Sequence, residues 1–183
     1  VSEAKSIDNV IILSSNLSDE KLGDEGYKLQ VDPKKITIQS NEPAGVFYGI
    51  QTLLQLLPNE ILNKKTDGQE IDWKIPCLYI YDKPQYSYRG MHLDVSRHFF
   101  PKKFILRFID LMAMYKMNVF HWHLTDDNGW RIEIKKYPEL PDVCAWRVDN
   151  EDQPWRTREQ AKPGEKATYG GFYTQEDIKE IIE

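Results

Sequence analysis

Hydrophobic and polar positions in the first part of the chain follow the period of strands and then that of a helix. Alternation between Tyr27 and Val31 resumes after a turn at Ile36, which predicts a β-hairpin over residues 27–40. Pro43 then begins a helix that Pro58 ends, and residues 75–82 are extended. The apolar stripe of this helix is expected at Val46, Phe47, Ile50, Leu53, Leu54 and Leu57. The pattern is typical of a small α+β domain.

After Pro84 the pattern becomes that of parallel α/β architecture. A strand candidate over residues 88–95 precedes a helix over residues 101–117, and a second strand follows at residues 119–124. A long loop leads to a last helix capped by Thr174, with Asp177 completing a weak capping box. The 97 residues from Ser87 to Glu183 hold two strand-helix units, whereas an eight-unit barrel needs about 200 to 250 residues.

The fold class expected from these patterns is α/β. Residues 1–83 form an accessory α+β domain, and residues 84–183 form the first two strand-helix units of a truncated (β/α)8 TIM barrel. A two-stranded parallel sheet is not a self-sufficient core, so the simplest interpretation is a piece of a longer barrel.

Composition and charge bear on two classes of protein, those that bind nucleic acid and those that span a membrane. A net charge of −5 gives no electrostatic reason to expect nucleic acid as a partner, and no apolar run approaches the roughly 20 residues of a membrane span. Cys77 and Cys144 are 67 positions apart, which fits isolated thiols better than a disulfide framework or a metal motif.

The segment from Asn118 to Arg131, NVFHWHLTDDNGWR, is the strongest candidate for a site. Alternation puts His121 and His123 on one face of the strand, with apolar side chains on the other. Asp126 and Asp127 follow the strand's carboxyl end, where parallel α/β folds carry their chemistry, and an Asn-Gly turn is expected after them.

The loop after the first of the two parallel strands holds a second candidate. Arg97 would lie at the mouth of a barrel, where its fork of donors suits sugar hydroxyls or a carboxylate. The alternative is an ion pair with Asp94 or Asp126 that only ties two loops together. Asp94, at the strand end, would orient Arg97 without touching a ligand.

His121 and His123 invite a metal-dependent hydrolase interpretation, because His-x-His at a strand end begins several metal sites. Only His92 and His98 remain elsewhere, so we expect that no multi-histidine site is completed within this chain and that no metal is bound. Both imidazoles would instead fill a polar layer and hydrogen-bond to neighbouring loops, with His123 nearer to any pocket.

Asp126 and Asp127 are also a poor catalytic pair. A retaining glycosidase pair needs carboxyl groups about 5 to 5.5 Å apart that face one sugar, and adjacent residues in an extended segment point in opposite directions. One of them is therefore expected to support a catalytic group elsewhere, and the other to cap the turn.

At these residues the chain resembles glycoside hydrolase family 20, the β-N-acetylhexosaminidases. The blocks LDVSRHFF (residues 93–100) and FHWHLTDDNGW (residues 120–130) resemble the start of the family's catalytic barrel, and YGGFYTQEDIKEII (residues 169–182) resembles its next segment. Upstream, ITIQSNEPAGVFYGIQTLLQLLP resembles the α+β domain before the barrel.

The resemblance implies an exo-glycosidase that removes terminal β-linked GlcNAc or GalNAc from a glycan with retention and without cofactor or metal. The substrate's acetamido oxygen is the nucleophile. Arg97 matches the arginine that binds the terminal sugar's hydroxyls, and Asp126 the aspartate that supports the acid/base carboxylate; Asp94, His123 and Asp127 would surround them.

The family's catalytic Asp-Glu pair has no counterpart here in its expected context. Asp19-Glu20 and Asp24-Glu25 lie far upstream of the barrel segment. We therefore expect the 183-residue chain to be inactive alone. An extracytoplasmic location is favoured by the resemblance only. A non-catalytic sugar-binding module remains the other alternative.

Overall fold

The computed structural model describes residues 8–62, 70–150, 152–154 and 162–183. The chain forms two compact units, divided between Ser87 and Tyr88. Within the described residues, no helix has the length and apolar character needed to cross a membrane. Cys77 and Cys144 are both exposed free thiols, as the sequence predicts.

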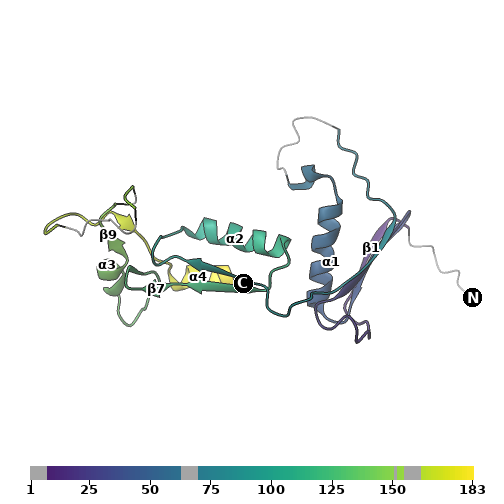
Figure 1. Cartoon of the computed structure of the whole chain (residues 1–183), viewed down its shortest axis with the longest axis horizontal. Coiled ribbons are helices and arrows are strands. Elements are labelled where there is room, and N and C mark those ends of the chain that lie inside the picture. The colour runs from purple at the N-terminus through teal and green to yellow at the C-terminus, as the bar shows by residue number, and fades with distance from the viewer. Residues whose placement is uncertain (1–7, 63–69, 151, 155–161) are drawn as a thin grey trace, which may run out of the picture. The chain divides into compact units, whose positions relative to one another are not determined.

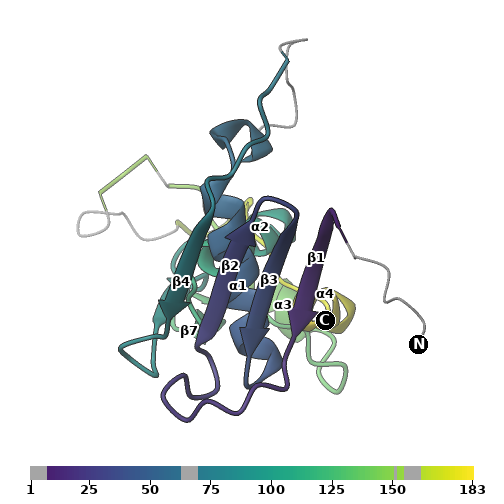
Figure 2. The same ribbon diagram turned by 90° about the vertical axis from the view of Figure 1, so that its right-hand side faces the viewer.

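The first unit is a four-stranded sheet with one helix against it. The strands are β1 (Val10–Ser14), β2 (Tyr27–Asp32), β3 (Lys35–Ser40) and β4 (Leu78–Asp82), arranged in the order β1-β3-β2-β4. β1 runs parallel to β3, and the other pairs are antiparallel. Helix α1 (Pro43–Leu56) covers one face (Figure 2), and a short 3-10 helix η1 (Asn59–Leu62) follows it. The predicted hairpin and helix are confirmed.

The face of α1 that packs on the sheet differs from the predicted stripe. Phe47 and Leu54, expected on the buried stripe, are 43% and 38% exposed. Gly45, Tyr48, Gly49 and Leu53 are the buried positions of the helix. A Cβ on Gly45 would lie 2.3 Å from the carbonyl oxygen of Gly26 and 2.5 Å from Ser40 Cβ. The glycines therefore bring the helix backbone against the strands, and they turn the larger apolar side chains away.

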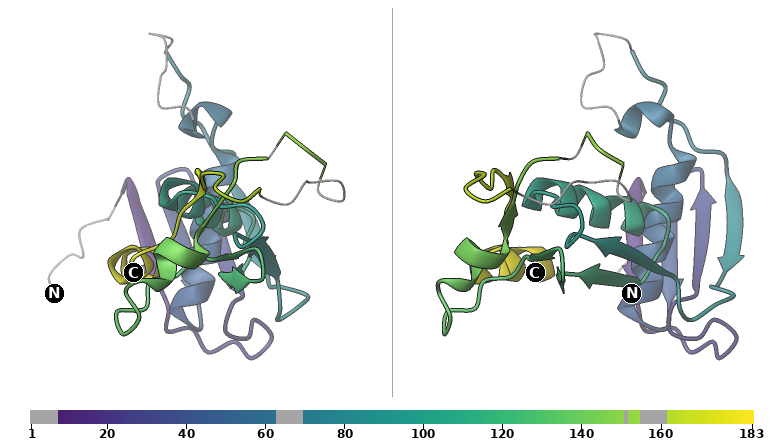
Figure 3. Two further views of the ribbon diagram at one scale, coloured as in Figure 1. Left: turned by 90° about the vertical axis from the view of Figure 1, so that its left-hand side faces the viewer. Right: turned by 60° about the vertical axis from the view of Figure 1, so that its left-hand side comes forward.

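The second unit is built on two parallel strands, β5 (Gly90–Asp94) and β6 (Val119–His123), joined by helix α2 (Lys102–Met114). Figure 3 shows α2 lying over one face of these strands. Phe120, Trp122 and Leu124 pack with Val95 and Ile105 in the core, so the predicted faces of β6 are confirmed. The helix ends three residues before the predicted Met117, because Lys116 has a left-handed φ of 57°.

The rest of this unit follows β6. A hairpin of β7 (Thr125–Asp126) and β8 (Gly129–Trp130) leads to α3 (Leu140–Cys144), and β9 (Trp146–Arg147) pairs with β10 (Tyr169–Gly170). Figure 1 shows β7, α3 and β9 at one end of the unit. The last helix, α4 (Gln175–Ile182), has the predicted capping box of Thr174 and Asp177. The described residues form a mixed α/β structure that contains no closed barrel.

A fully buried arginine holds this end of the unit together. The Arg131 guanidinium donates to the backbone carbonyls of Val95 (3.1 Å), Ser96 (2.9 Å), Gly171 (3.3 Å) and Ala145. Its side chain has no solvent exposure, so these bonds replace water. Gly129 makes room for it, because a Cβ there would lie 2.4 Å from Arg131 Cζ.

We expect Gly45→Ala to destabilise the protein by about 1 to 3 kcal/mol, because the new methyl group meets the backbone of Gly26. Helix propensity alone would favour alanine by about 1 kcal/mol. The sign of the change in the free energy of unfolding therefore shows whether packing or helix propensity dominates at this position. Urea denaturation measures the change, and Ala44→Gly at the adjacent exposed position measures the propensity term by itself. A more stable Gly45→Ala variant would contradict the close approach.

Arg131→Met should cost about 3 kcal/mol or more, because methionine is of similar length and leaves several buried carbonyls without a donor, each at about 1 to 3 kcal/mol. Urea denaturation followed by tryptophan fluorescence gives the loss. Arg107→Met, at an exposed position of α2, is the matched control and should change stability by less than about 0.5 kcal/mol. A loss below about 1 kcal/mol for Arg131→Met would mean that the carbonyls find other partners.

Candidate functional site

Arg97 is positioned by the turn that ends β5. Asp94 Oδ1 accepts the backbone N–H groups of Ser96 (3.0 Å) and Arg97 (3.1 Å), which is an Asx-type turn. The other carboxylate oxygen of Asp94 accepts from Arg97 Nη1 at 2.8 Å. Asp94 therefore shapes the loop and orients the guanidinium at the same time.

β6 and β7 bring two more groups to Arg97. Asp126 Oδ2 lies 2.6 Å from Arg97 Nη1 and 2.9 Å from His123 Nε2, and that ring nitrogen is 3.0 Å from the same Nη1. The register of the parallel pair explains the meeting, because Asp94 on β5 is the direct partner of His123 on β6. The side chains of Asp94, Arg97, His123 and Asp126, the arginine cluster, are between 30% and 40% exposed.

Asp126 is held in its ionised form. The backbone N–H of Asp127 donates to Asp126 Oδ1 at 2.8 Å, and this bond, followed by the one with His123, lowers the pKa of Asp126 to about 2. The charge of Arg97 acts in the same direction, and partial desolvation opposes it. A carboxylate that is ionised at neutral pH cannot be a general acid, so Asp126 is suited to bind or orient other groups.

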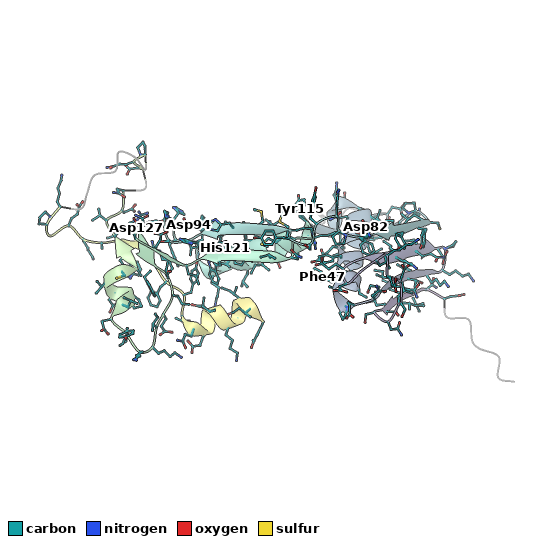
Figure 4. All side chains as sticks on the ribbon, turned by 60° about the horizontal axis from the view of Figure 1, so that its bottom comes forward. Phe47, Asp82, Asp94, Tyr115, His121 and Asp127 are labelled. Carbon is teal, nitrogen blue, oxygen red and sulfur yellow. The ribbon has the colours of Figure 1, made fainter. Side chains whose placement is uncertain are left out.

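Asp127 lies in the turn that follows and not among the contacts of Arg97. It is exposed and adjoins the cluster through its backbone N–H. The hairpin pairs Asp126 with Gly129, so Asp127 and Asn128 are its two loop residues, and the expected Asn-Gly turn is shifted by one position. Figure 4 shows Asp94 and Asp127 at the same end of the unit, with His121 further along β6.

The loop from Val95 to Phe100 is clamped, residue after residue, by side chains from later in the chain. Arg131 binds the carbonyls of residues 95 and 96, and Arg147 Nη2 donates to the carbonyl of Arg97 at 2.8 Å. Tyr169 Oη binds His98 Nδ1 (2.8 Å) and accepts the N–H of Phe99 (3.2 Å), and Tyr173 donates to the carbonyl of Phe100. Burial raises the pKa of Tyr173 well above its usual range, so it remains a donor.

These clamping residues were missed in the sequence, which predicted only a long loop after Trp130. The alternation of Trp130, Ile132 and Ile134 assigns Arg131 to the polar side of an extended segment, where solvent is the default environment. No spacing marks Arg147 or Tyr169. The one available signal is Arg131 itself, next to a glycine-containing hairpin.

The histidines are arranged differently from expectation. His92, His121 and His123 project from the face of β5 and β6 opposite to α2, and one ring nitrogen from each lies within 4.8 Å of the others. The expectation that no multi-histidine cluster is completed within this chain is wrong, because the strand register adds His92. These three residues could hold a metal ion.

The arginine cluster offers hydrogen-bond donors to a ligand, and its ionised Asp126 does not serve as a proton donor. The Arg97 guanidinium contacts Asp94, His123 and Asp126 through Nη1. A planar fork of this kind binds vicinal hydroxyls or a carboxylate. The predicted ion pairs of Arg97 with Asp94 and Asp126 are confirmed, and the binding of a ligand by Arg97 stays a prediction.

A surface depression lies on the first unit. It is lined by residues 17–21, Lys28 and Tyr81. Two of its charged groups pair with each other, with Lys28 Nζ 2.8 Å from Asp19 Oδ2, and Tyr81 donates to Asp19 Oδ1 at 3.2 Å. Lys28 and Asp19 are therefore already paired.

Two family models match the chain. Residues 1–83 match glycosyl hydrolase family 20, domain 2, and residues 86–183 match glycosyl hydrolase family 20, catalytic domain. A β-hexosaminidase of Porphyromonas gingivalis is 43% identical over 162 residues, which is 88% of this chain and 19% of that protein.

Solved structures agree with this assignment. The exo-β-N-acetylglucosaminidase of Vibrio harveyi, in complex with N-acetylglucosamine, matches 94% of this chain and 25% of its own with a TM-score of 0.73 at 39% identity. The N-acetyl-β-hexosaminidase of Streptomyces plicatus matches 94% and 30% with a TM-score of 0.75 at 38% identity. The chain spans less than a third of each of these relatives. The chain belongs to glycosyl hydrolase family 20.

Proposed function

We propose that residues 1–83 and 84–183 are the accessory domain and the N-terminal part of a (β/α)8 catalytic barrel of an exo-acting β-N-acetylhexosaminidase. The enzyme hydrolyses terminal β-linked N-acetylhexosamine from glycans with retention, and the substrate's own acetamido oxygen is the nucleophile. The observation that carries the proposal is the arginine cluster at the carboxyl ends of two parallel strands.

In this proposal Arg97 binds the hydroxyls of the terminal sugar. Asp94 and Asp126 hold its Nη1 from two sides, so the orientation of the fork is fixed before the sugar arrives. Such preorganisation reduces the entropy that binding must otherwise overcome. The clamped backbone of residues 95–100 serves the same end, because it prevents the loop from moving with the ligand.

Asp126 acts as a support for the acid/base carboxylate. Its low pKa keeps it charged near neutral pH, and a fixed negative charge disfavours ionisation of a neighbouring carboxylic acid. A raised pKa is what a catalytic acid in a glycosidase requires. The proton donor itself is a glutamate outside these 183 residues, with the aspartate that orients the acetamido group before it.

Arg97→Ala in an enzyme that contains the complete catalytic domain should lower kcat/KM by about 10- to 150-fold. The basis is the loss of hydrogen bonds from a charged donor, about 1.5 to 3 kcal/mol. Steady-state hydrolysis of a chromogenic β-GlcNAc substrate measures it, with the exposed Arg107→Ala as matched control. An unchanged kcat/KM would show that Arg97 only joins the two loops.

The 183-residue chain by itself should not turn over p-nitrophenyl N-acetyl-β-glucosaminide, because its cluster lacks a proton donor and general acid catalysis typically supplies about 10²- to 10⁴-fold. Release of p-nitrophenol is the readout, and an enzyme with the whole catalytic domain is the positive control. Sustained turnover by the 183-residue chain would place the catalytic acid within it and contradict the proposed division of roles.

A further inference from the structure

Three of the four histidines of the chain meet on one face of β5 and β6. His92 and His121 are direct partners in the parallel register, and their rings are 4.6 Å apart between centroids. His123 is two residues further along β6 on the same face, with its ring 5.7 Å from that of His92. Because both strands are hydrogen-bonded in one register, the three backbone positions are fixed relative to one another.

The ligand atoms are close to the spacing that a metal ion requires. One nitrogen from each ring lies within 4.8 Å of the other two. A tetrahedral zinc ion with Zn–N bonds of about 2.0 to 2.1 Å needs nitrogens about 3.4 Å apart. His92 and His121 are exposed in the 183-residue chain, which leaves their side chains free to rotate toward a shared ion.

The surroundings of His123 suit a ligand. His123 Nε2 is 2.9 Å from Asp126 Oδ2 and 3.0 Å from Arg97 Nη1. In the tautomer that carries its proton on Nε2, the ring donates to the carboxylate and keeps the lone pair on Nδ1 for a metal ion. A carboxylate behind a metal-bound histidine fixes its tautomer and raises its basicity. The two negative charges of Asp94 and Asp126 exceed the single positive charge of Arg97. The arginine cluster beside the histidines therefore does not repel a cation.

We propose that His92, His121 and His123 form a binding site for one late first-row divalent metal ion, with Zn²⁺ as the representative. Neutral imidazole is the ligand type that zinc, copper and nickel share, whereas Mg²⁺ and Ca²⁺ prefer oxygen. The site is a binding site and not a hydrolytic centre, and its test does not depend on glycosidase activity.

The test is a zinc titration of the tag-free 183-residue chain by isothermal calorimetry. We expect one Zn²⁺ per chain, and at least tenfold weaker binding in both His92→Ala and His121→Ala. His98→Ala is the matched control, because His98 bonds Tyr169 outside the cluster; its affinity should equal that of the unaltered chain. Visible absorption of bound Co²⁺ reports tetrahedral nitrogen coordination, and circular dichroism checks that each variant is folded.

Two results would overturn the site. One is the absence of stoichiometric zinc binding by the folded chain. The other is binding that His92→Ala and His121→Ala leave unchanged, which would place the ion on other groups. Loss of glycosidase activity plays no part in either outcome, so failure of the metal site and failure of the proposed function remain distinguishable.

Discussion

The end of the second unit depends on one buried cation that is satisfied by backbone carbonyls. Arg131 joins the turn after β5 to the chain near α3 and to the chain after β10, three stretches that are far apart in sequence. The carbonyl of Ala145 also accepts the N–H of Gly171, but the other carbonyls would lose their guanidinium donor, a cost of about 1 to 3 kcal/mol for each one left buried without a partner. Further along the loop, backbone groups of residues 97–100 bind the side chains of Arg147, Tyr169 and Tyr173. Several independent hydrogen bonds therefore fix the backbone that carries Arg97. The position of Arg97 thus depends on residues more than 30 positions later in the chain.

The electrostatics of the site follow from that fixed backbone. Arg97 lies between Asp94 and Asp126, and the bonds that Asp126 accepts keep it ionised. A group with a depressed pKa serves as a permanent charge and not as a proton donor. In the proposed function the residues of the arginine cluster therefore bind and orient, and proton transfer needs a carboxyl group in a different environment.

The sequence predicted what local periodicity determines and missed what tertiary contacts determine. The faces of β6 follow from alternation, and the capping box of α4 follows from Thr174 and Asp177. The buried face of α1 was predicted only in part, because Gly45 and Gly49 set the approach of the helix, and a hydrophobic pattern gives no weight to glycine. Arg131 was missed for a related reason. Alternation predicts that its side chain faces solvent, whereas its acceptors are backbone carbonyls of segments that are distant in sequence and meet only in the folded chain.

Strand register is the second feature that could not be predicted from the sequence. His92 and Asp94 each face a histidine of β6, so one register builds both the histidine cluster and the arginine cluster. His123 belongs to both, since it bonds Asp126 and lies within reach of His92 and His121. Two sites that share a side chain are energetically coupled, and the coupling is reciprocal. In the tautomer with its proton on Nε2, His123 donates to Asp126 and offers Nδ1 to an ion, so a metal on the strand face and the contact with Asp126 would favour the same tautomer.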